Sequence, residues 1–84
     1  QMDTEKKLRR TLRDAYVSYA TQDKFVLIKV LPCNGPALAA LLEAMHYDEV
    51  FGTIGDDATV LIICKTLATT LDLQQKIQRL LSDN

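Results

Sequence analysis

Tryptophan, histidine and cysteine are absent or scarce in this sequence, and each scarcity excludes a class of site. The 84 residues contain no tryptophan, one histidine and two cysteines. Cys33 and Cys64 show neither CxxC nor zinc-ligand spacing, and they are too few for a disulfide scaffold. His46 has no second histidine with which it could form a metal pair. The sequence therefore predicts no metal site and a reducing environment.

Long apolar runs and a strong net charge are also missing. No apolar stretch reaches the roughly 18 residues of a membrane-spanning helix, and no signal peptide opens the chain. We therefore expect a cytoplasmic protein with no membrane partner. The net charge of −1 gives no overall attraction for nucleic acid. The one basic cluster, residues 6–10, is typical of a solvated terminal face, with a phosphate or linker contact as the alternative.

What is present is the composition of a small globular domain. The chain is 48% hydrophobic and 25% charged, and its length predicts one domain. A domain of this size lies near the lower limit for a self-sufficient core, and small domains often gain stability by oligomerising. The opening Gln1-Met2 suggests a cut point. We therefore expect an assembling fragment of a longer protein.

Hydrophobic patterning predicts two β-hairpins. Residues 15–19 alternate between the two sheet faces, and residues 25–31 form an apolar run interrupted only by Lys29. Two further β-branched runs, at residues 50–54 and 59–64, form the second hairpin. The predicted connecting turns are residues 21–24 and 55–58.

A helix is predicted after each hairpin. The first spans residues 35 to about 46, with Asn34 as a candidate N-cap. The second is expected to be capped by Thr69 or Thr70. Residues 3–13 are rich in helix formers and predict either a short helix or a linker. The apolar stripes of the two main helices are Leu38, Leu41, Leu42 and Met45, and Leu73, Ile77, Leu80 and Leu81.

The order ββαββα predicts an α/β chain of the α+β two-layer sandwich type. Its four-stranded, mostly antiparallel sheet should carry two helices on one face. The strand at residues 25–31 is apolar on both sides, so it is expected to be buried on both faces or nearly so. The second sheet face therefore favours contact with another subunit.

Asp56 and Asp57 form an acidic pair in the predicted loop of the second hairpin. Aspartate is common in such turns because its side chain binds local backbone donors. Paired carboxylates also suit a cation, either a metal ion or a guanidinium. Further oxygen ligands for a metal such as calcium are lacking, whereas one carboxylate can bind a guanidinium through two parallel hydrogen bonds. Turn chemistry and cation binding both remain open from the residues alone.

An enzyme is not indicated. No serine or cysteine lies in a nucleophile elbow, and Gly52-x-x-Gly55 is too short for a phosphate-binding loop. His46 lies at the C-terminal end of a predicted helix, where the helix dipole stabilises a cationic side chain. The sequence thus lacks a nucleophile, a paired base and a cofactor motif.

Three short segments carry a resemblance to a known family. They are Leu31-Pro32-x-Asn34, Gly52-Thr53-Ile54-x-x-Asp57, and Thr59-x-Leu61-Ile62-Ile63-Cys64-Lys65. With matching element lengths, the stretch from Phe25 to Leu81 resembles the C-terminal domain of bacterial arginine repressors. The resemblance spans about two-thirds of the chain.

The resemblance implies a domain for assembly and ligand sensing. Family domains form trimers that stack into hexamers, and L-arginine, the co-repressor, binds between the trimers. A winged-helix domain, absent from this sequence, binds operator DNA in front of genes of arginine biosynthesis and catabolism. By analogy, residues 1–13 would be the end of the interdomain linker or a short helix, and residues 14–84 the C-terminal domain. The implied partners are copies of the chain, alone or mixed with a paralogue.

The resemblance also implies the arginine-binding residues, with no metal. Aspartates of the hairpin loop hold the ligand in the family, and an acid on the first helix is common there. The corresponding residues of this chain are Asp57, Asp56, Thr53, Gly55, Glu43 and Asn34.

The hairpin departs from the family pattern Gly-Thr-Ile-x-Gly-Asp-Asp-Thr. Aligned without gaps, Asp57 matches the first family aspartate, Ala58 replaces the second, and Asp56 replaces a glycine. In the alternative alignment, the loop is shifted by one residue, so that Gly55-Asp56-Asp57 matches the family pattern and Ala58 is inserted. The strand after the loop matches the family only without a net gap, which favours the substitution. Cys33 also replaces a family glycine, and Pro36 stands where relatives often carry a polar residue. We therefore predict weak or altered arginine binding, with an assembly-only domain or another amino-acid sensor as alternatives.

Overall fold

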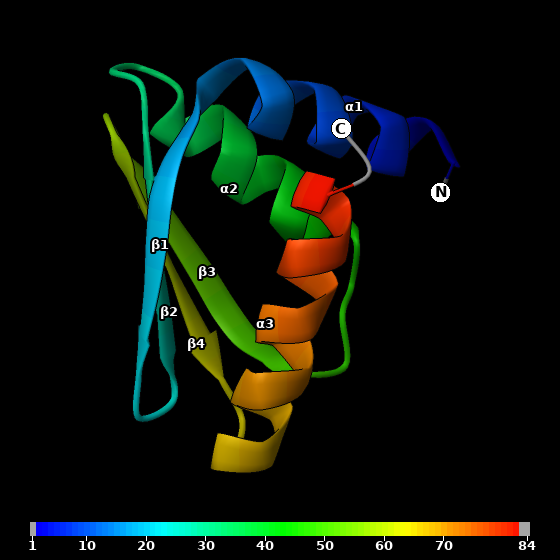
Figure 1. The fold of residues 1–84 in the computed structure, drawn as a ribbon, viewed down its shortest axis with the longest axis vertical. Coiled ribbons are helices and arrows are strands. Elements are labelled where there is room, and N and C mark those ends of the chain that lie inside the picture. The colour runs from blue at the N-terminus through cyan, green and yellow to red at the C-terminus, as the bar shows by residue number, and fades with distance from the viewer. Residues whose placement is uncertain (1, 83–84) are drawn as a thin grey trace.

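A computed structural model describes residues 2–82 as a sheet covered by helices on one face (Figure 1). The strands pair antiparallel throughout in the order β1-β2-β4-β3. The predicted α+β fold class is therefore confirmed. The elements are α1 (Met2–Ala15), β1 (Tyr16–Gln22), β2 (Phe25–Val30), α2 (Gly35–Ala44), β3 (Val50–Asp56), β4 (Thr59–Cys64) and α3 (Leu67–Ser82).

The core lies between the sheet and the helices. Alternate residues of the two central strands point toward the helices, because successive side chains of a strand point to opposite faces. Helices α2 and α3 meet them with leucine and isoleucine side chains at helical spacing. The buried hydrophobic residues of these four elements are Val26, Ile28, Val30, Leu38, Ala39, Leu42, Val60, Ile62, Cys64, Leu73, Ile77 and Leu80.

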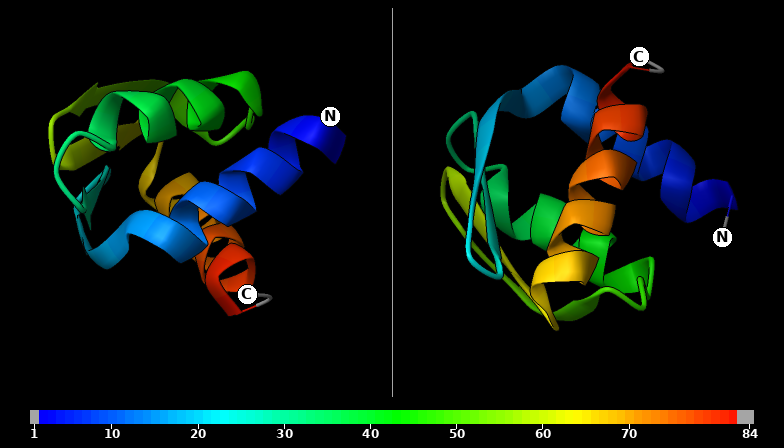
Figure 2. Two further views of the ribbon diagram at one scale, coloured as in Figure 1. Left: turned by 90° about the horizontal axis from the view of Figure 1, so that it is seen from above. Right: turned by 60° about the horizontal axis from the view of Figure 1, so that its bottom comes forward.

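Three helices cover the sheet, and not the two expected. Residues 3–13, for which a helix and a linker were both open, lie within the 14-residue α1. Leu8 and Leu12 are at most 2% exposed, so α1 packs into the core and crosses α2 and α3 (Figure 2). Ala15, predicted to begin the first strand, is instead the buried last residue of α1. Helical spacing brings these three residues to one face of the helix.

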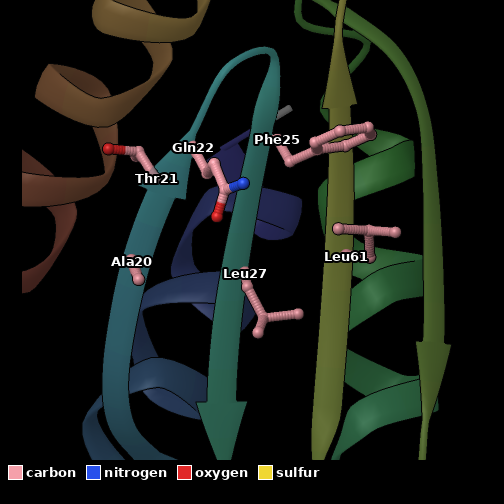
Figure 3. A pocket seen from close by; sticks show the side chains of 6 residues that line it. All are labelled: Ala20, Thr21, Gln22, Phe25, Leu27 and Leu61. Atoms are coloured by element: carbon pink, nitrogen blue, oxygen red, sulfur yellow. The ribbon is translucent and has the colours of Figure 1, made fainter.

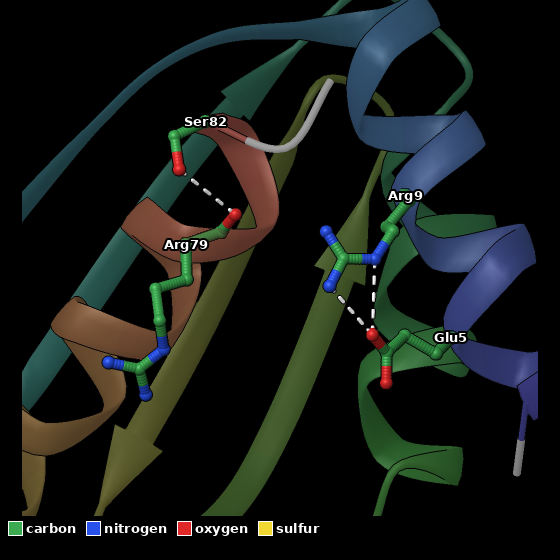
Figure 4. A network of polar contacts seen from close by, with 4 residues as sticks. All are labelled: Glu5, Arg9, Arg79 and Ser82. Carbon is green, nitrogen blue, oxygen red and sulfur yellow. Dashed lines mark hydrogen bonds and ion pairs between the residues drawn. The ribbon is translucent and has the colours of Figure 1, made fainter.

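Polar contacts along α1 and α3 follow helical spacing as well. Glu5 Oε2 accepts hydrogen bonds from Nε and Nη2 of Arg9, at 3.1 and 2.7 Å (Figure 4). This arrangement is the favourable order for an i,i+4 pair. Near the end of α3, Ser82 Oγ donates to the carbonyl oxygen of Arg79 at 3.2 Å.

Helix α3 begins at Leu67, earlier than expected, so neither Thr69 nor Thr70 occupies its N-cap position. Thr66 and Thr69 cap the helix reciprocally: each backbone N–H donates to the other hydroxyl, at 2.8 and 3.0 Å. This is the geometry of a capping box, with threonine in place of the usual glutamate. Thr70 is buried inside the first turn, and its hydroxyl donates to the Thr66 carbonyl at 2.7 Å. Of the predicted core face of this helix, Leu73, Ile77 and Leu80 are buried, and Leu81 packs against the core while partly exposed.

The opposite face of the sheet is open. Phe25 is 42% exposed, and it lies beside Leu27 and Leu61 around a shallow hollow of about 340 Å³ (Figure 3). Strand β2 is therefore buried on one face only within a single chain, which corrects the expectation of burial on both. No helix among residues 2–82 has the length and apolar character needed to cross a membrane.

Candidate functional site

The acidic hairpin ends in a two-residue turn. Strand β3 continues to Asp56, which pairs with Thr59 of β4, so only Asp57 and Ala58 form the turn. The predicted loop of residues 55–58 is thus shorter than expected. Asp57 has a φ of 38°, in the left-handed region that aspartate tolerates better than most residues. This turn places the Asp57 carboxylate beside the segment that leads into α2.

Asp57 fastens the hairpin to the start of α2. Its carboxylate Oδ1 accepts a hydrogen bond from the Cys33 backbone N–H at 3.0 Å. Its backbone carbonyl accepts one from Gly35 N–H at 2.6 Å, and the Ala58 carbonyl accepts one from Val30 N–H at 2.9 Å. Part of the hydrogen-bonding capacity of this carboxylate is therefore used inside the chain.

Two glycines allow this close approach. A Cβ on Gly35 would lie 2.6 Å from the Asp56 carbonyl oxygen, and a Cβ on Gly55 would lie 2.5 Å from the Cβ of Ala39. Real Cβ atoms essentially never come this close to other atoms. Only glycine fits at both positions, so the hairpin and α2 are in direct backbone contact. The role of Gly55 is thus to leave room for α2 to pack against the hairpin.

Asn34 occupies the N-cap position of α2 but does not cap the helix with its side chain. Its Nδ2 donates instead to the carbonyl oxygens of Leu31 and Pro32, at 3.2 and 3.1 Å. The prediction that Asn34 occupies the N-cap position is therefore confirmed, but its side chain makes no capping hydrogen bond. The asparagine stabilises the loop that presents Cys33 to the hairpin.

Cys33 lies in a conformation that favours glycine. Its φ is 74°, where the Cβ of an L-residue crowds the backbone. The side chain is exposed, and the backbone N–H is the group that binds Asp57. The arginine repressor pattern has glycine at this position, and the backbone keeps the shape that a glycine would adopt freely.

A hollow of about 530 Å³ lies beside the contact between Gly55 and Ala39. Ala39 lies at the boundary, because it touches Gly55 and also lines this hollow. Glu43 contributes an exposed carboxylate, and Thr53 also lines the hollow, although its hydroxyl oxygen is itself buried and has no hydrogen-bond partner. A buried hydroxyl without a partner is unfavourable and is unusual in native proteins. The remaining lining residues are Ala40, Phe51, Gly52, Ile54 and Ile63.

The six residues named from the sequence thus divide into two adjacent groups. Glu43 and Thr53 line the hollow, whereas Gly55 and Asp57 belong to the contact between hairpin and helix, and Asn34 lies in the loop that leads into α2. Asp56 is exposed at the end of β3, with its backbone in contact with Gly35.

Sequence reasoning missed three residues of this site, namely Cys33, Gly35 and Ala39. The small residues at 35, 39 and 55 were the only available signal for the close packing of helix and hairpin. No group of three or more histidine, cysteine, aspartate or glutamate side chains in the described range is arranged to hold a metal ion.

Comparison with known proteins shows the family to which the chain belongs. A family described as "Arginine repressor, C-terminal domain" matches residues 12–79, so the chain belongs to this family. The matching relatives are named arginine repressors, which are regulators and not enzymes, as the sequence led us to expect.

Individual relatives agree with this assignment. An arginine repressor of Lactiplantibacillus plantarum is 86% identical over 84 residues, which are 100% of this chain and 55% of the relative. Those of Bacillus licheniformis and Bacillus subtilis are 40% and 37% identical over 89% of this chain and 50% of each relative. The chain thus spans about half the length of the curated relatives that it matches.

Proposed function

We propose that this chain is the assembly and L-arginine-sensing domain of a cytoplasmic, arginine-responsive transcriptional regulator. The observation that carries the proposal is the hollow beside the acidic hairpin. It is lined by Glu43, which carries an exposed carboxylate, and by Thr53, whose buried hydroxyl has no hydrogen-bond partner. Asp57 follows Gly55 by two residues, and Gly55 packs against Ala39, which also lines the hollow. Carboxylates suit the guanidinium and ammonium groups of arginine, and a hydroxyl offers a further hydrogen bond.

The ligand affinity is proposed to be reduced. Asp57 Oδ1 already accepts the Cys33 N–H, and Ala58 carries no carboxylate where the family pattern has its second aspartate. The loss of one charged contact weakens binding by about 1.5–3 kcal/mol, roughly tenfold or more. Asp56 and Asn34 are proposed to lie at the rim of the ligand site.

Assembly is proposed to use the open sheet face. This face presents Phe25, Leu27 and Leu61 at its centre, and a contiguous apolar surface of this kind typically marks a contact with a partner. The proposed assemblies are a homotrimer and a homohexamer, or mixed forms with a paralogue. A ligand bound between subunits stabilises the assembled state, so binding and assembly are linked.

DNA binding is proposed to reside in a winged-helix domain that is not part of this sequence. Residues 1–13 were expected to be the end of the linker or a short helix. Because α1 packs into the core, we propose that residues 2–13 belong with the domain at residues 14–84 and carry its connection to the DNA-binding domain. The complete regulator would control genes of arginine biosynthesis and catabolism.

Titration calorimetry with L-arginine tests the ligand proposal. We expect binding that is lost in Asp57→Ala and also in Asp57→Asn. The asparagine variant keeps an oxygen that can accept the Cys33 N–H, so its loss of binding would reflect charge and not loop structure. Binding that survives Asp57→Ala would contradict the proposed site.

An assembly-only domain is the second candidate, and the missing carboxylate at Ala58 favours it. Sedimentation with and without L-arginine separates the two, because only a sensing domain changes its hexamer fraction. If another amino acid shifts the melting temperature and arginine does not, the chain is a sensor for a different ligand.

A further inference from the structure

The outward side of α1 is positively charged. The helix buries Leu8, Leu12 and Ala15 on one side, and its exposed basic residues lie elsewhere on its surface. Arg9 differs from these residues because it is half-buried and bonded to Glu5 (Figure 4). The exposed residues, which we call the basic face of α1, are Lys6, Lys7, Arg10 and Arg13.

The fold makes little use of this basic face. Its one ion pair among residues 2–82 joins Arg13 Nε to Asp14 Oδ1 at 3.6 Å, and both side chains are more than half exposed. An exposed pair of this kind contributes little to stability. The charged groups of this face are therefore available to an external partner.

The net charge of −1 conceals an uneven distribution. Residues 3–14 contain five basic and three acidic residues, whereas the rest of the chain contains five basic and eight acidic residues. Positive charge is thus concentrated on α1, and the body of the domain is negative. A polyanion would be attracted to α1 and repelled by the body, which fixes the side from which it approaches.

The position of α1 also matters. Its N-terminal end extends beyond the other helices (Figures 1 and 2). The family match is to a C-terminal domain, and the chain covers about half of each relative. In those relatives the remaining half therefore lies mainly before the counterpart of α1, on the side of the proposed DNA-binding domain.

We propose that the basic face of α1 contacts the phosphate backbone of duplex DNA and strengthens binding without reading sequence. Residues 6 and 13 are about 10 Å apart along the helix axis at 1.5 Å per residue. That length covers about three phosphates of one strand at 3.4 Å spacing. The inference rests on the proposed function, because it assumes a regulator that reaches DNA.

The test compares two double variants that remove equal charge. Lys6→Gln with Arg10→Gln alters the basic face, and Lys24→Gln with Lys65→Gln removes two exposed lysines from the body. Binding of a fluorescent 20-base-pair duplex is measured for each by anisotropy between about 20 and 200 mM salt. Each lost phosphate contact lowers the slope of log K against log salt by about 0.9.

We expect the α1 variant to lose about 1.8 of this slope and roughly tenfold or more in affinity at low salt. The body variant should keep the slope of the parent chain. Lys6→Arg with Arg10→Lys should also keep it, because the charges remain. Helix content measured by circular dichroism checks that each variant is folded.

Equal slopes for the two charge-removing variants would overturn the proposal. So would an α1 variant whose assembly changes in sedimentation while its DNA binding does not, because the face would then bind protein. Arginine titration of the same variants keeps the two proposals apart. If the chain binds DNA through α1 but does not bind arginine, only the proposed arginine-sensing function is contradicted.

Discussion

The two hairpins of this domain have the same local design and different surroundings. Each ends in a two-residue turn that opens with an aspartate at positive φ, 53° for Asp23 and 38° for Asp57. The Asp57 carboxylate accepts a hydrogen bond from the Cys33 N–H, just before α2. The carbonyls of its turn accept two more, from the backbone N–H groups of Gly35 and Val30. Among the described contacts, the Asp23 side chain has no such bond. A turn of the same design thus becomes part of a site where the backbone that leads into a helix donates a hydrogen bond to its aspartate.

The largest expected effect comes from filling the space between hairpin and helix. Gly55→Ala should lower the free energy of unfolding by about 1–3 kcal/mol, because the new Cβ would overlap Ala39 and the Gly35 carbonyl. Gly52→Ala in the same strand is the control, since a Cβ there meets nothing within 4 Å. Urea unfolding measures both. If the two variants are equally stable, the close contact does not exist in solution.

Adding a carboxylate to each turn compares the two hairpins as ligand sites. Ala58→Asp should strengthen L-arginine binding by about 1.5–3 kcal/mol, roughly tenfold or more, because it supplies the second acid of the family pattern. Lys24→Asp places an acid at the matching position of the other turn and should leave the affinity unchanged. Calorimetry provides both values. An unchanged affinity in Ala58→Asp would contradict the substitution alignment and favour a slipped loop.

Removing each turn aspartate isolates the contact between hairpin and α2. Asp57→Ala should cost about 1 kcal/mol more than Asp23→Ala, because only Asp57 accepts a backbone hydrogen bond. Both variants place alanine at positive φ, so the backbone strain largely cancels in the comparison. Chemical denaturation at neutral pH gives the difference. A larger loss at Asp23 would show that the bond to Cys33 contributes nothing.

The smallest expected effect concerns the backbone of Cys33. Cys33→Gly should stabilise the domain by about 0.5–1 kcal/mol, because glycine adopts a φ of 74° without strain. Asp23→Gly should gain less, since aspartate tolerates positive φ better than cysteine does. Thermal unfolding should show a rise of a few degrees for the first variant. A lower melting temperature would indicate that the cysteine side chain stabilises the loop.

Sequence reasoning succeeded where short-range pattern decides structure. Strand β4 was predicted with its observed ends, and the core face of α3 was correct because helical spacing alone selects Leu73, Ile77 and Leu80. Errors occurred at the ends of elements. The Thr66–Thr69 cap was missed because threonine replaces the expected glutamate. Strands β1 and β3 continue three and two residues further than polarity suggested, and β2 ends one residue earlier than predicted.

The sequence by itself determined the order ββαββα after the first helix, the family and the identity of the acidic residues. Residue pattern and local turn chemistry are sufficient for these. Only the tertiary structure decided that Asp57 bonds to Cys33, that Gly35 and Gly55 bring hairpin and helix into contact, and that α1 completes the core. These features depend on contacts between residues far apart in the chain, and no local preference encodes which distant backbone groups will meet.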